Sequence, residues 1–200
     1  MAGTQTTDTQ KPNTLKHRAV LALGSNLGES EDTLERAVAD LVAGGVQLVR
    51  ASGLYRTAPV GGPAGQPDFV NAVIEVATDL GAYELLKLCN AVEAAHHRER
   101  LVRWGPRTLD IDVIDYEGTV SDDPVLTLPH PRAHERAFVL TPWARMDPEA
   151  RLLVARNDGG AVTYVPVSVA ELSRDLNLTH EDAGEDAIRY MREMNLSVSP

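Results

Sequence analysis

Two carboxylates separated by a single residue, Asp110 and Asp112, are the strongest chemical signal in this sequence. Residues 109–116 alternate apolar and polar side chains, which predicts a strand on which both acids point to the same face. Paired carboxylates suit Mg²⁺, because this ion binds one or two protein acids and completes its coordination shell with water and phosphate oxygens. The sequence therefore predicts a metal site here, with an ordinary solvent-facing strand as the alternative.

Four arginines precede the acidic pair within residues 98–107, accompanied by a single glutamate. They are Arg98, Arg100, Arg103 and Arg107. Guanidinium groups bind phosphate oxygens through paired hydrogen bonds and stay charged at any working pH. Phosphoryl transfer depends on positioning and on neutralising negative charge, so cations beside metal-binding acids suit that chemistry. The combination favours a polyphosphate site over a solvated surface loop.

A second basic cluster accompanies the sequence Leu-Pro-His-Pro at residues 128–131. It contains His130, and Arg132, His134 and Arg136 follow. The two prolines restrict the loop, so that a histidine there can be held against a phosphate with little entropy left to lose. We interpret His130 as a candidate for phosphate binding because of this setting, although an isolated histidine is more often structural.

Three residues are candidates for binding a flat heterocyclic ring. Asn71 lies in an otherwise apolar predicted strand, and its amide can hydrogen-bond to the edge of such a ring. Phe69 and Phe138 are the only phenylalanines, and either can stack on the ring, with core packing as the alternative. Residues 24–28 follow a strand and precede a helix, but they lack the lysine of a P-loop and the spacing of a dinucleotide fingerprint. We interpret this glycine-containing segment as a tight turn.

The elements that must position these residues follow from hydrophobic periodicity and turn residues. Strands are predicted at residues 20–23, 46–57, 69–78, 109–116 and 161–167, with helices between Ser30 and Gly44, at 82–97 and 138–145, and from 169 onward. The order strand, helix, strand, strand, helix, strand predicts an α+β sandwich of ferredoxin-like topology. We expect helices on one face of a mainly antiparallel sheet.

Composition limits the class of protein. The chain has 200 residues and a net charge of −10, which disfavours nucleic-acid binding because that affinity depends on basic side chains. Cys89 is the only cysteine, so the chain needs no intramolecular disulfide and suits a reducing compartment. The first 16 residues contain no apolar run. We therefore expect a cytoplasmic protein that binds no membrane, and we expect it to be a monomer.

Three segments are expected along the chain. Residues 1–16 are predicted to be a flexible extension, residues 17–174 the functional domain, and residues 175–200 an acidic, mobile tail. The alternative for the tail is a docked helix with a stripe of Ile188, Met191 and Met194.

Five motifs, in this order, resemble the 6-hydroxymethyl-7,8-dihydropterin pyrophosphokinases of folate biosynthesis. They are Leu-Gly-Ser-Asn-Leu-Gly at 23–28, Tyr-Arg-Thr-Ala-Pro at 55–59, Gln-Pro-Asp-Phe-Val-Asn at 66–71, Arg-Trp-Gly-Pro-Arg-Thr-Leu-Asp-Ile-Asp at 103–112 and Leu-Pro-His-Pro at 128–131. The resemblance covers about residues 18–150. It implies an enzyme that transfers pyrophosphate, as one unit, from ATP to the hydroxymethyl group of the pterin and releases AMP.

The resemblance also implies roles for the matching residues. Asp110 and Asp112 would hold two Mg²⁺ ions, and Arg98 and Arg107 would clamp the phosphates during the reaction. The ATP side would be formed by Asn90, Glu93, Arg100, Arg103, Trp104, Thr127, His130 and Arg136. The pterin slot would be formed by Thr57, Ala58, Val60, Phe69, Asn71 and Phe138. Loops at residues 58–67 and 98–106 would close over ATP and exclude water.

Two other functions remain open on the residues alone. Metal-dependent glycosyltransferases that use nucleotide sugars also combine an Asp-x-Asp pair with basic residues, but this does not account for the amide and aromatic candidates. A non-catalytic module that binds nucleotides would use the same phosphate site. Release of AMP only in the presence of the pterin distinguishes the pyrophosphokinase from both.

Overall fold

The computed structural model describes residues 16–59, 65–96, 108–179 and 188–197. The first part of the chain forms β1 (His17–Ser25), α1 (Ser30–Ala43), β2 (Val46–Ala51), β3 (Leu54–Thr57), β4 (Phe69–Thr78), α2 (Ala82–Ala95) and β5 (Asp110–Tyr116). The second part forms β6 (Ser121–Asp123), β7 (Leu126–Leu128), α3 (Ala137–Met146), β8 (Arg151–Asp158), β9 (Ala161–Ser168), α4 (Val169–Thr179) and β10 (Arg189–Arg192). A short 3₁₀ turn at Ala133–Glu135 precedes α3.

The main sheet has the strand order β10-β3-β4-β1-β5, and β2 also pairs with β4. Every pairing in this sheet is antiparallel. The longest ladder joins β1 to β4, from His17 opposite Thr78 to Ser25 opposite Val70. The predicted α+β class with a mainly antiparallel sheet and packed helices is confirmed.

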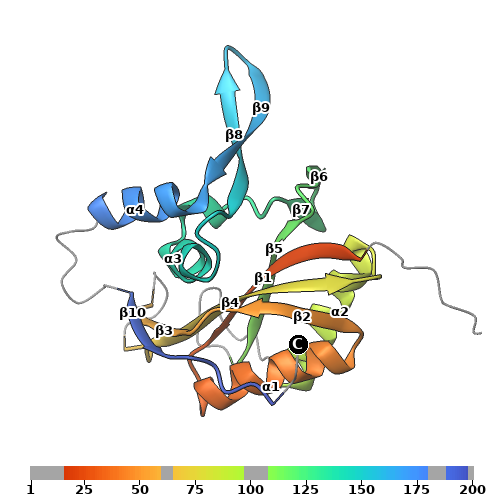
Figure 1. The fold of residues 1–200 in the computed structure, drawn as a ribbon, viewed down its shortest axis with the longest axis vertical. Coiled ribbons are helices and arrows are strands. Elements are labelled where there is room, and N and C mark those ends of the chain that lie inside the picture. Colours follow the sequence, from red (N-terminus) through yellow and green to blue (C-terminus); the bar gives the residue numbers. More distant parts are fainter. Residues whose placement is uncertain (1–15, 60–64, 97–107, 180–187, 198–200) are drawn as a thin grey trace, which may run out of the picture.

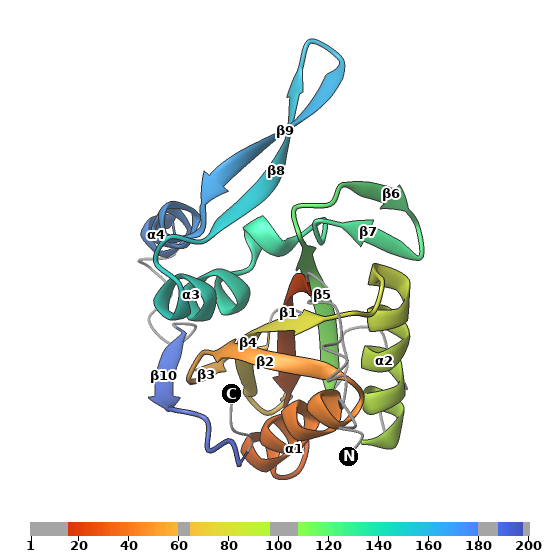
Figure 2. The same ribbon diagram turned by 45° about the vertical axis from the view of Figure 1, so that its right-hand side comes forward.

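Helices cover both faces of this sheet, with α1 and α2 on one side and α3 on the other (Figures 1 and 2). Alternate residues of β1 serve the two sides: Leu21 and Leu23 pack in the core under α1 and α2, whereas Val20 and Ala22 pack in the core under α3. The expectation that the helices lie on one face is wrong. The continuous apolar run of β1 places apolar side chains on both faces of the sheet, so both faces must be covered by helices.

The predicted single strand at residues 46–57 is wrong, because it is interrupted at Ser52 and Gly53. The Ser52 hydroxyl accepts a hydrogen bond from the amide of Val73 at 2.9 Å and donates to the carbonyl of Gly53 at 2.8 Å. This side chain therefore replaces a main-chain partner at the break. As a result β2 and β3 pair with different parts of β4.

Two hairpins extend from the sheet, β6-β7 and the longer β8-β9 (Figure 2). The sequence predicts β9 but misses β8, its partner. Most of the hairpin beyond Leu152 and Val154 is exposed, so its hydropathy gives a weak strand signal. Among the described segments, no helix is long and apolar enough to span a bilayer.

The C-terminal region differs most from expectation. The prediction of a mobile tail is wrong for residues 188–197, because β10 pairs with β3, and the docked-helix alternative is wrong for the same reason. Helix α4 also continues past the predicted boundary at residue 174. Met191, Met194 and Leu196 pack against the main core. Residues 1–15, in the predicted N-terminal extension, and residues 180–187 lie outside the described part of the chain.

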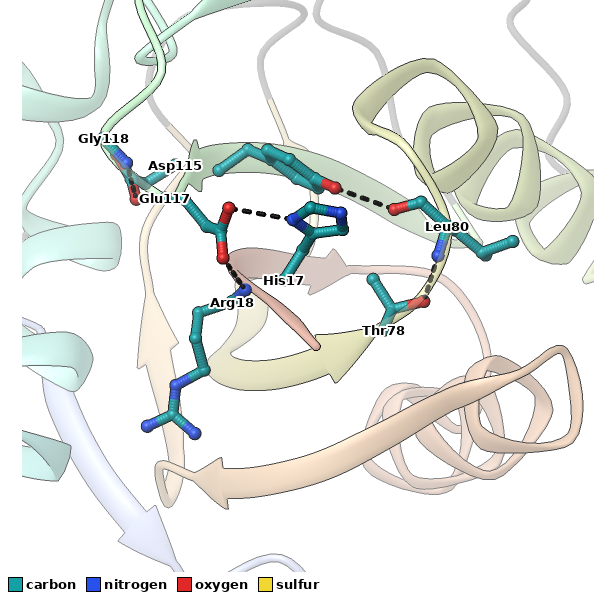
Figure 3. Close-up of polar contacts among 8 residues, drawn as sticks. His17, Arg18, Thr78, Leu80, Asp115, Glu117 and Gly118 are labelled. Atoms are coloured by element: carbon teal, nitrogen blue, oxygen red, sulfur yellow. Dashed lines mark hydrogen bonds and ion pairs between the residues drawn. The ribbon is translucent and has the colours of Figure 1, made fainter. Parts of the chain in front are cut away.

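Polar contacts fasten the start of β1 to the end of β5 (Figure 3). The His17 Nδ1 atom lies 2.9 Å from a carboxylate oxygen of Glu117, whose other oxygen accepts a hydrogen bond from the amide of Arg18 at 3.2 Å. The hydrogen bond with His17 lowers the pKa of Glu117. Nearby, the Tyr116 hydroxyl donates to the carbonyl of Leu80 at 2.8 Å. These contacts help to hold β5 in register with β1.

The single thiol, Cys89, is predicted to be unreactive in the native protein. Its side chain is fully buried on α2, and burial, together with the nearby Glu93 carboxylate, raises its pKa to about 12. Because the thiolate is the reactive species, we expect iodoacetamide to leave Cys89 unmodified at pH 8 in buffer and to alkylate it fully in denaturant. Intact mass measurement follows the reaction, and rapid alkylation of the native protein would contradict the buried placement.

Candidate active site

Polar side chains from neighbouring strands meet on the α3 face of the sheet. Asp110 on β5 lies opposite Gly24 on β1, and Gly24 lies opposite Asn71 on β4. Residues paired across antiparallel strands point to the same face, so the acid and the amide flank the glycine. One pair further along, Asp112 lies opposite Ala22. The expected strand alternation is confirmed, because Ile111 and Val113 face the core under α1 and α2 instead.

Gly24 allows the Asn71 side chain to lie close against β1. A methyl group at this position would lie 3.1 Å from Oδ1 of Asn71 and 3.9 Å from a ring carbon of Phe69. Adjacent strands are about 4.8 Å apart, so the backbones of Asp110 and Asn71 are separated by roughly 10 Å across the glycine. The turn interpretation of residues 24–28 missed this, because the contact depends on the pairing of distant strands.

Asn71 is held by Thr57 at the end of β3. The Asn71 amide donates to the Thr57 hydroxyl at 2.8 Å, and both residues are buried. The Asn71 carbonyl oxygen lies beside Gly24, 3.1 Å from the position that a Cβ would take there. The structure therefore brings together two predicted slot residues and leaves an acceptor beside the glycine.

Asp112 is the centre of a charged cluster. Arg136 donates from Nη1 to Oδ2 of Asp112 at 3.0 Å, and Nε2 of His130 lies 3.9 Å from the same oxygen. The guanidinium of Arg136 also lies 5.5 Å from the centre of the Phe138 ring. Arg136 thus connects a predicted metal ligand to a predicted wall of the ring slot.

Hydrogen bonding and burial set the protonation of His130. Its Nδ1 accepts the backbone N–H of Arg132 at 3.2 Å, so in the neutral ring Nε2 carries the proton and faces Asp112. Burial lowers the pKa of His130; the Asp112 carboxylate opposes this shift and the Arg136 guanidinium adds to it. His130 therefore presents an N–H donor to the charged cluster.

Glu93, expected on the nucleotide side, is buried between α2 and β5. Its side chain is only 3% exposed, and Oε1 accepts the backbone N–H of Ile111 at 2.7 Å. Ile111 lies between Asp110 and Asp112, so this hydrogen bond from Ile111 to Glu93 fixes β5 between the two acids. In the sequence, the apolar spacing of α2 places Glu93 next to buried positions such as Val92. The contact with the Ile111 amide depends on the packing of α2 against β5, which the spacing does not predict.

The remaining candidates are distributed around this centre. Asn90 is exposed on α2, one turn before Glu93, and Ala58 directly follows β3. The Thr127 hydroxyl on β7 donates to the carbonyl of Asp123 at 3.1 Å. Six candidates lie outside the described residues: Val60, Arg98, Arg100, Arg103, Trp104 and Arg107.

Two carboxylates on one strand are a suitable donor set for Mg²⁺. Asp110 and Asp112 are both partly exposed. In the described residues, no group of three or more histidine, cysteine, aspartate or glutamate side chains is placed to hold a metal. Mg²⁺ does not require such a group, since it keeps water and takes phosphate oxygens from its substrate.

Comparisons with known proteins agree on one family. The sequence model of the 7,8-dihydro-6-hydroxymethylpterin-pyrophosphokinase (HPPK) family matches residues 20–148. A 2-amino-4-hydroxy-6-hydroxymethyldihydropteridine pyrophosphokinase of Methylorubrum extorquens is 46% identical over 133 residues, which cover 66% of this chain and 84% of that protein. The protein of the same name from Mycobacterium bovis is 41% identical over 186 residues, covering 88% of this chain and 90% of its own length.

Solved structures show the same fold. The crystal structure of wild-type HPPK-DHPS from Plasmodium falciparum matches 88% of this chain with a TM-score of 0.59 and 13% sequence identity. This chain spans 50% of the length of that protein. At this identity the structural likeness supports the fold alone, and the sequence matches support the family.

Proposed function

This chain belongs to the 7,8-dihydro-6-hydroxymethylpterin-pyrophosphokinase family, and we propose that it transfers the pyrophosphoryl group of ATP to 6-hydroxymethyl-7,8-dihydropterin. The observation that carries the proposal is the row Asp110, Gly24 and Asn71 on adjacent strands. It places an anionic, metal-binding position on one side of the glycine and an uncharged hydrogen-bonding group on the other. We propose that a bicyclic ring with a hydroxymethyl arm lies between these two groups.

Asn71 is the residue that orients the ring. Its carbonyl oxygen accepts a hydrogen bond from an N–H on the ring edge, while Thr57 holds its NH₂ group. Phe69 and Phe138 stack on the two ring faces, and Ala58 and Val60 complete the slot. Fixing both substrates before reaction removes much of the entropic cost of a bimolecular step.

The reaction forms one bond and breaks another at the β-phosphorus of ATP. The hydroxymethyl oxygen bonds to this phosphorus, the bond to the α–β bridging oxygen breaks, and AMP leaves with that oxygen. The hydroxyl proton passes to Asp110 or to water. Mg²⁺ held by Asp110 and Asp112 supplies charge neutralisation at the phosphates, and we propose two ions.

Basic side chains neutralise the charge that develops on the phosphates. Arg136 and His130 surround Asp112 and can donate to phosphate oxygens from there. Arg98 and Arg107 clamp the transferred group. The nucleotide is held by Asn90, Arg100, Arg103, Trp104 and Thr127. We also propose that the protein is a monomer and that it works in the cytoplasm, a reducing compartment that suits a chain with a single cysteine.

The test is incubation of the full chain with ATP, Mg²⁺ and 6-hydroxymethyl-7,8-dihydropterin, followed by measurement of AMP. We expect AMP only when pterin and Mg²⁺ are both present, and none after chelation of the metal. ATP binding without AMP would support a non-catalytic nucleotide module instead. Turnover of a nucleotide sugar would support a glycosyltransferase.

Gly24→Ala is expected to weaken pterin binding about tenfold, because one added carbon in a fitted pocket typically costs that much or more. The new methyl group lies 3.1 Å from the Asn71 oxygen and intrudes on the ring site. ATP affinity should stay within about twofold, since the phosphate side is unchanged. Calorimetry with each ligand measures both.

Gly81→Ala is the matched control, because its added carbon meets nothing closer than 3.5 Å. Unchanged pterin affinity in Gly24→Ala would contradict the slot.

A further inference from the structure

Strand β10 reaches the substrate-binding region although it lies outside the family match, which ends at residue 148. It pairs antiparallel with β3, with Tyr190 opposite Tyr55. Strand β3 ends at Thr57, the residue that holds the amide of Asn71. β10 therefore forms the outer edge of the sheet next to the proposed pterin slot (Figure 1).

Arg192 fastens this strand to the first helix. Its Nε lies 2.8 Å from a carboxylate oxygen of Glu31, and its Nη1 lies 2.6 Å from a carboxylate oxygen of Glu35. The two acids are one turn apart on α1, so a single planar guanidinium reaches both. The amide of Asn195 also donates to Glu35 at 2.7 Å. These contacts connect segments about 160 residues apart in the sequence.

Tyr190 links the two elements that carry opposite walls of the slot. Its ring packs edge-on against Tyr55 of β3, with ring centres 5.6 Å apart. The guanidinium of Arg145 also lies 4.9 Å from the Tyr190 ring centre. Arg145 belongs to α3, the helix that also carries Phe138. Tyr190 therefore contacts both β3 and α3.

The approach of β10 to β3 depends on a glycine. A methyl group on Gly53 would lie 2.5 Å from a ring carbon of Tyr190 and 2.9 Å from the backbone oxygen of Arg192. The second contact is with main chain, which cannot rotate away. Any larger residue at position 53 must displace β10.

We propose that β10 is a positioning element for pterin binding, in which Arg192 and Tyr190 hold β3 so that Thr57 keeps Asn71 in its binding orientation. This inference rests on the proposed function. Without β10, β3 would be an exposed edge strand of four residues, which is short and weakly held. Loss of the edge would loosen Leu54, Tyr55 and Arg56, which pair with β10, and through them Thr57. The acids on β5 lie on the far side of β4 and β1 and would keep their positions.

The experiment disrupts the contact from each side in the full chain. Arg192→Ala removes the ion pairs with Glu31 and Glu35 on α1. Gly53→Ala obstructs the pairing of β10 with β3 without changing the sequence of β10. We expect each to raise the Kd for pterin about tenfold, with the Kd for ATP and kcat at saturation within about twofold of wild type. Arg192→Lys, which keeps the charge, should recover part of the pterin affinity. Arg156→Ala on the exposed hairpin and Gly81→Ala are the matched controls.

Two results would overturn the inference. In the first, hydrogen exchange at the β3 amides becomes faster in the variants but their pterin affinity stays at the wild-type value. This would show that β10 can be displaced without any effect on pterin binding. The other is an equal loss of pterin and ATP affinity, which indicates general destabilisation. If wild-type protein itself binds no pterin, the proposed function fails, and this outcome is distinct from both.

Discussion

Asp110→Asn is expected to lose at least about 10³-fold in kcat while its affinity for pterin stays close to wild type. The substitution keeps the size of the side chain and removes the charge that holds Mg²⁺ beside the hydroxymethyl oxygen. Asn71 and Thr57 bind the ring from another strand, so the pterin site remains intact. Single-turnover measurement of AMP gives the rate, and calorimetry gives the affinity.

Asp115→Asn is the matched control for this experiment. It alters an acid on the same strand, where Asp115 accepts a hydrogen bond from the amide of Gly118 at 3.2 Å and has no part in the site. We expect its kcat to remain near wild type. Retained turnover in Asp110→Asn, or an equal loss in the control, would rule out a specific metal role for Asp110.

Glu93→Leu is expected to lower kcat/KM about 10- to 100-fold, the usual cost of removing a group that orients a metal ligand. The leucine leaves the N–H of Ile111 without its 2.7 Å acceptor in a buried position. An unsatisfied buried amide costs about 1–3 kcal/mol, so the strand between Asp110 and Asp112 is expected to shift and stability to fall. Steady-state kinetics and denaturant unfolding measure the two effects.

Glu93→Gln separates a positioning role from a charge role. Glutamine keeps an oxygen that can accept from Ile111, so we expect kcat/KM to recover to within about threefold of wild type. Asn90→Ala, one turn away on the exposed side of α2, tests nucleotide contact from the same helix. Glutamine as damaging as leucine would show that the charge of Glu93, rather than its hydrogen bond, is what the enzyme needs.

The local parts of the fold were predictable from the sequence. Strand β4 begins and ends where its apolar run does, and the alternation around Asp110 and Asp112 correctly assigns the acids to one face. Both signals depend on residues within a few positions of one another. The expected metal pair and the expected partners Asn71 and Thr57 are likewise found in one region of the structure.

Features that depend on distant pairings were not predictable. Gly24 comes to lie between an acid and an amide only through the register of three strands. Glu93 contacts β5 only because α2 packs there. Strand β10 is held by its main-chain pairing with β3 and by the ion pair between Arg192 and Glu31. Hydropathy within a short window carries no information on these contacts. The exposed hairpin β8-β9 gives a weak signal because it buries little on either face.

The most direct test of the central claim uses ATP labelled at the β-phosphorus, with Mg²⁺, pterin and the full chain. We expect the label in a pterin diphosphate and the AMP to be unlabelled, because the bond between the β-phosphorus and the α–β bridging oxygen is the one that breaks. Separation of the products by chromatography follows the label. Label recovered in ADP or free phosphate, with the pterin unlabelled, would contradict pyrophosphoryl transfer by this protein.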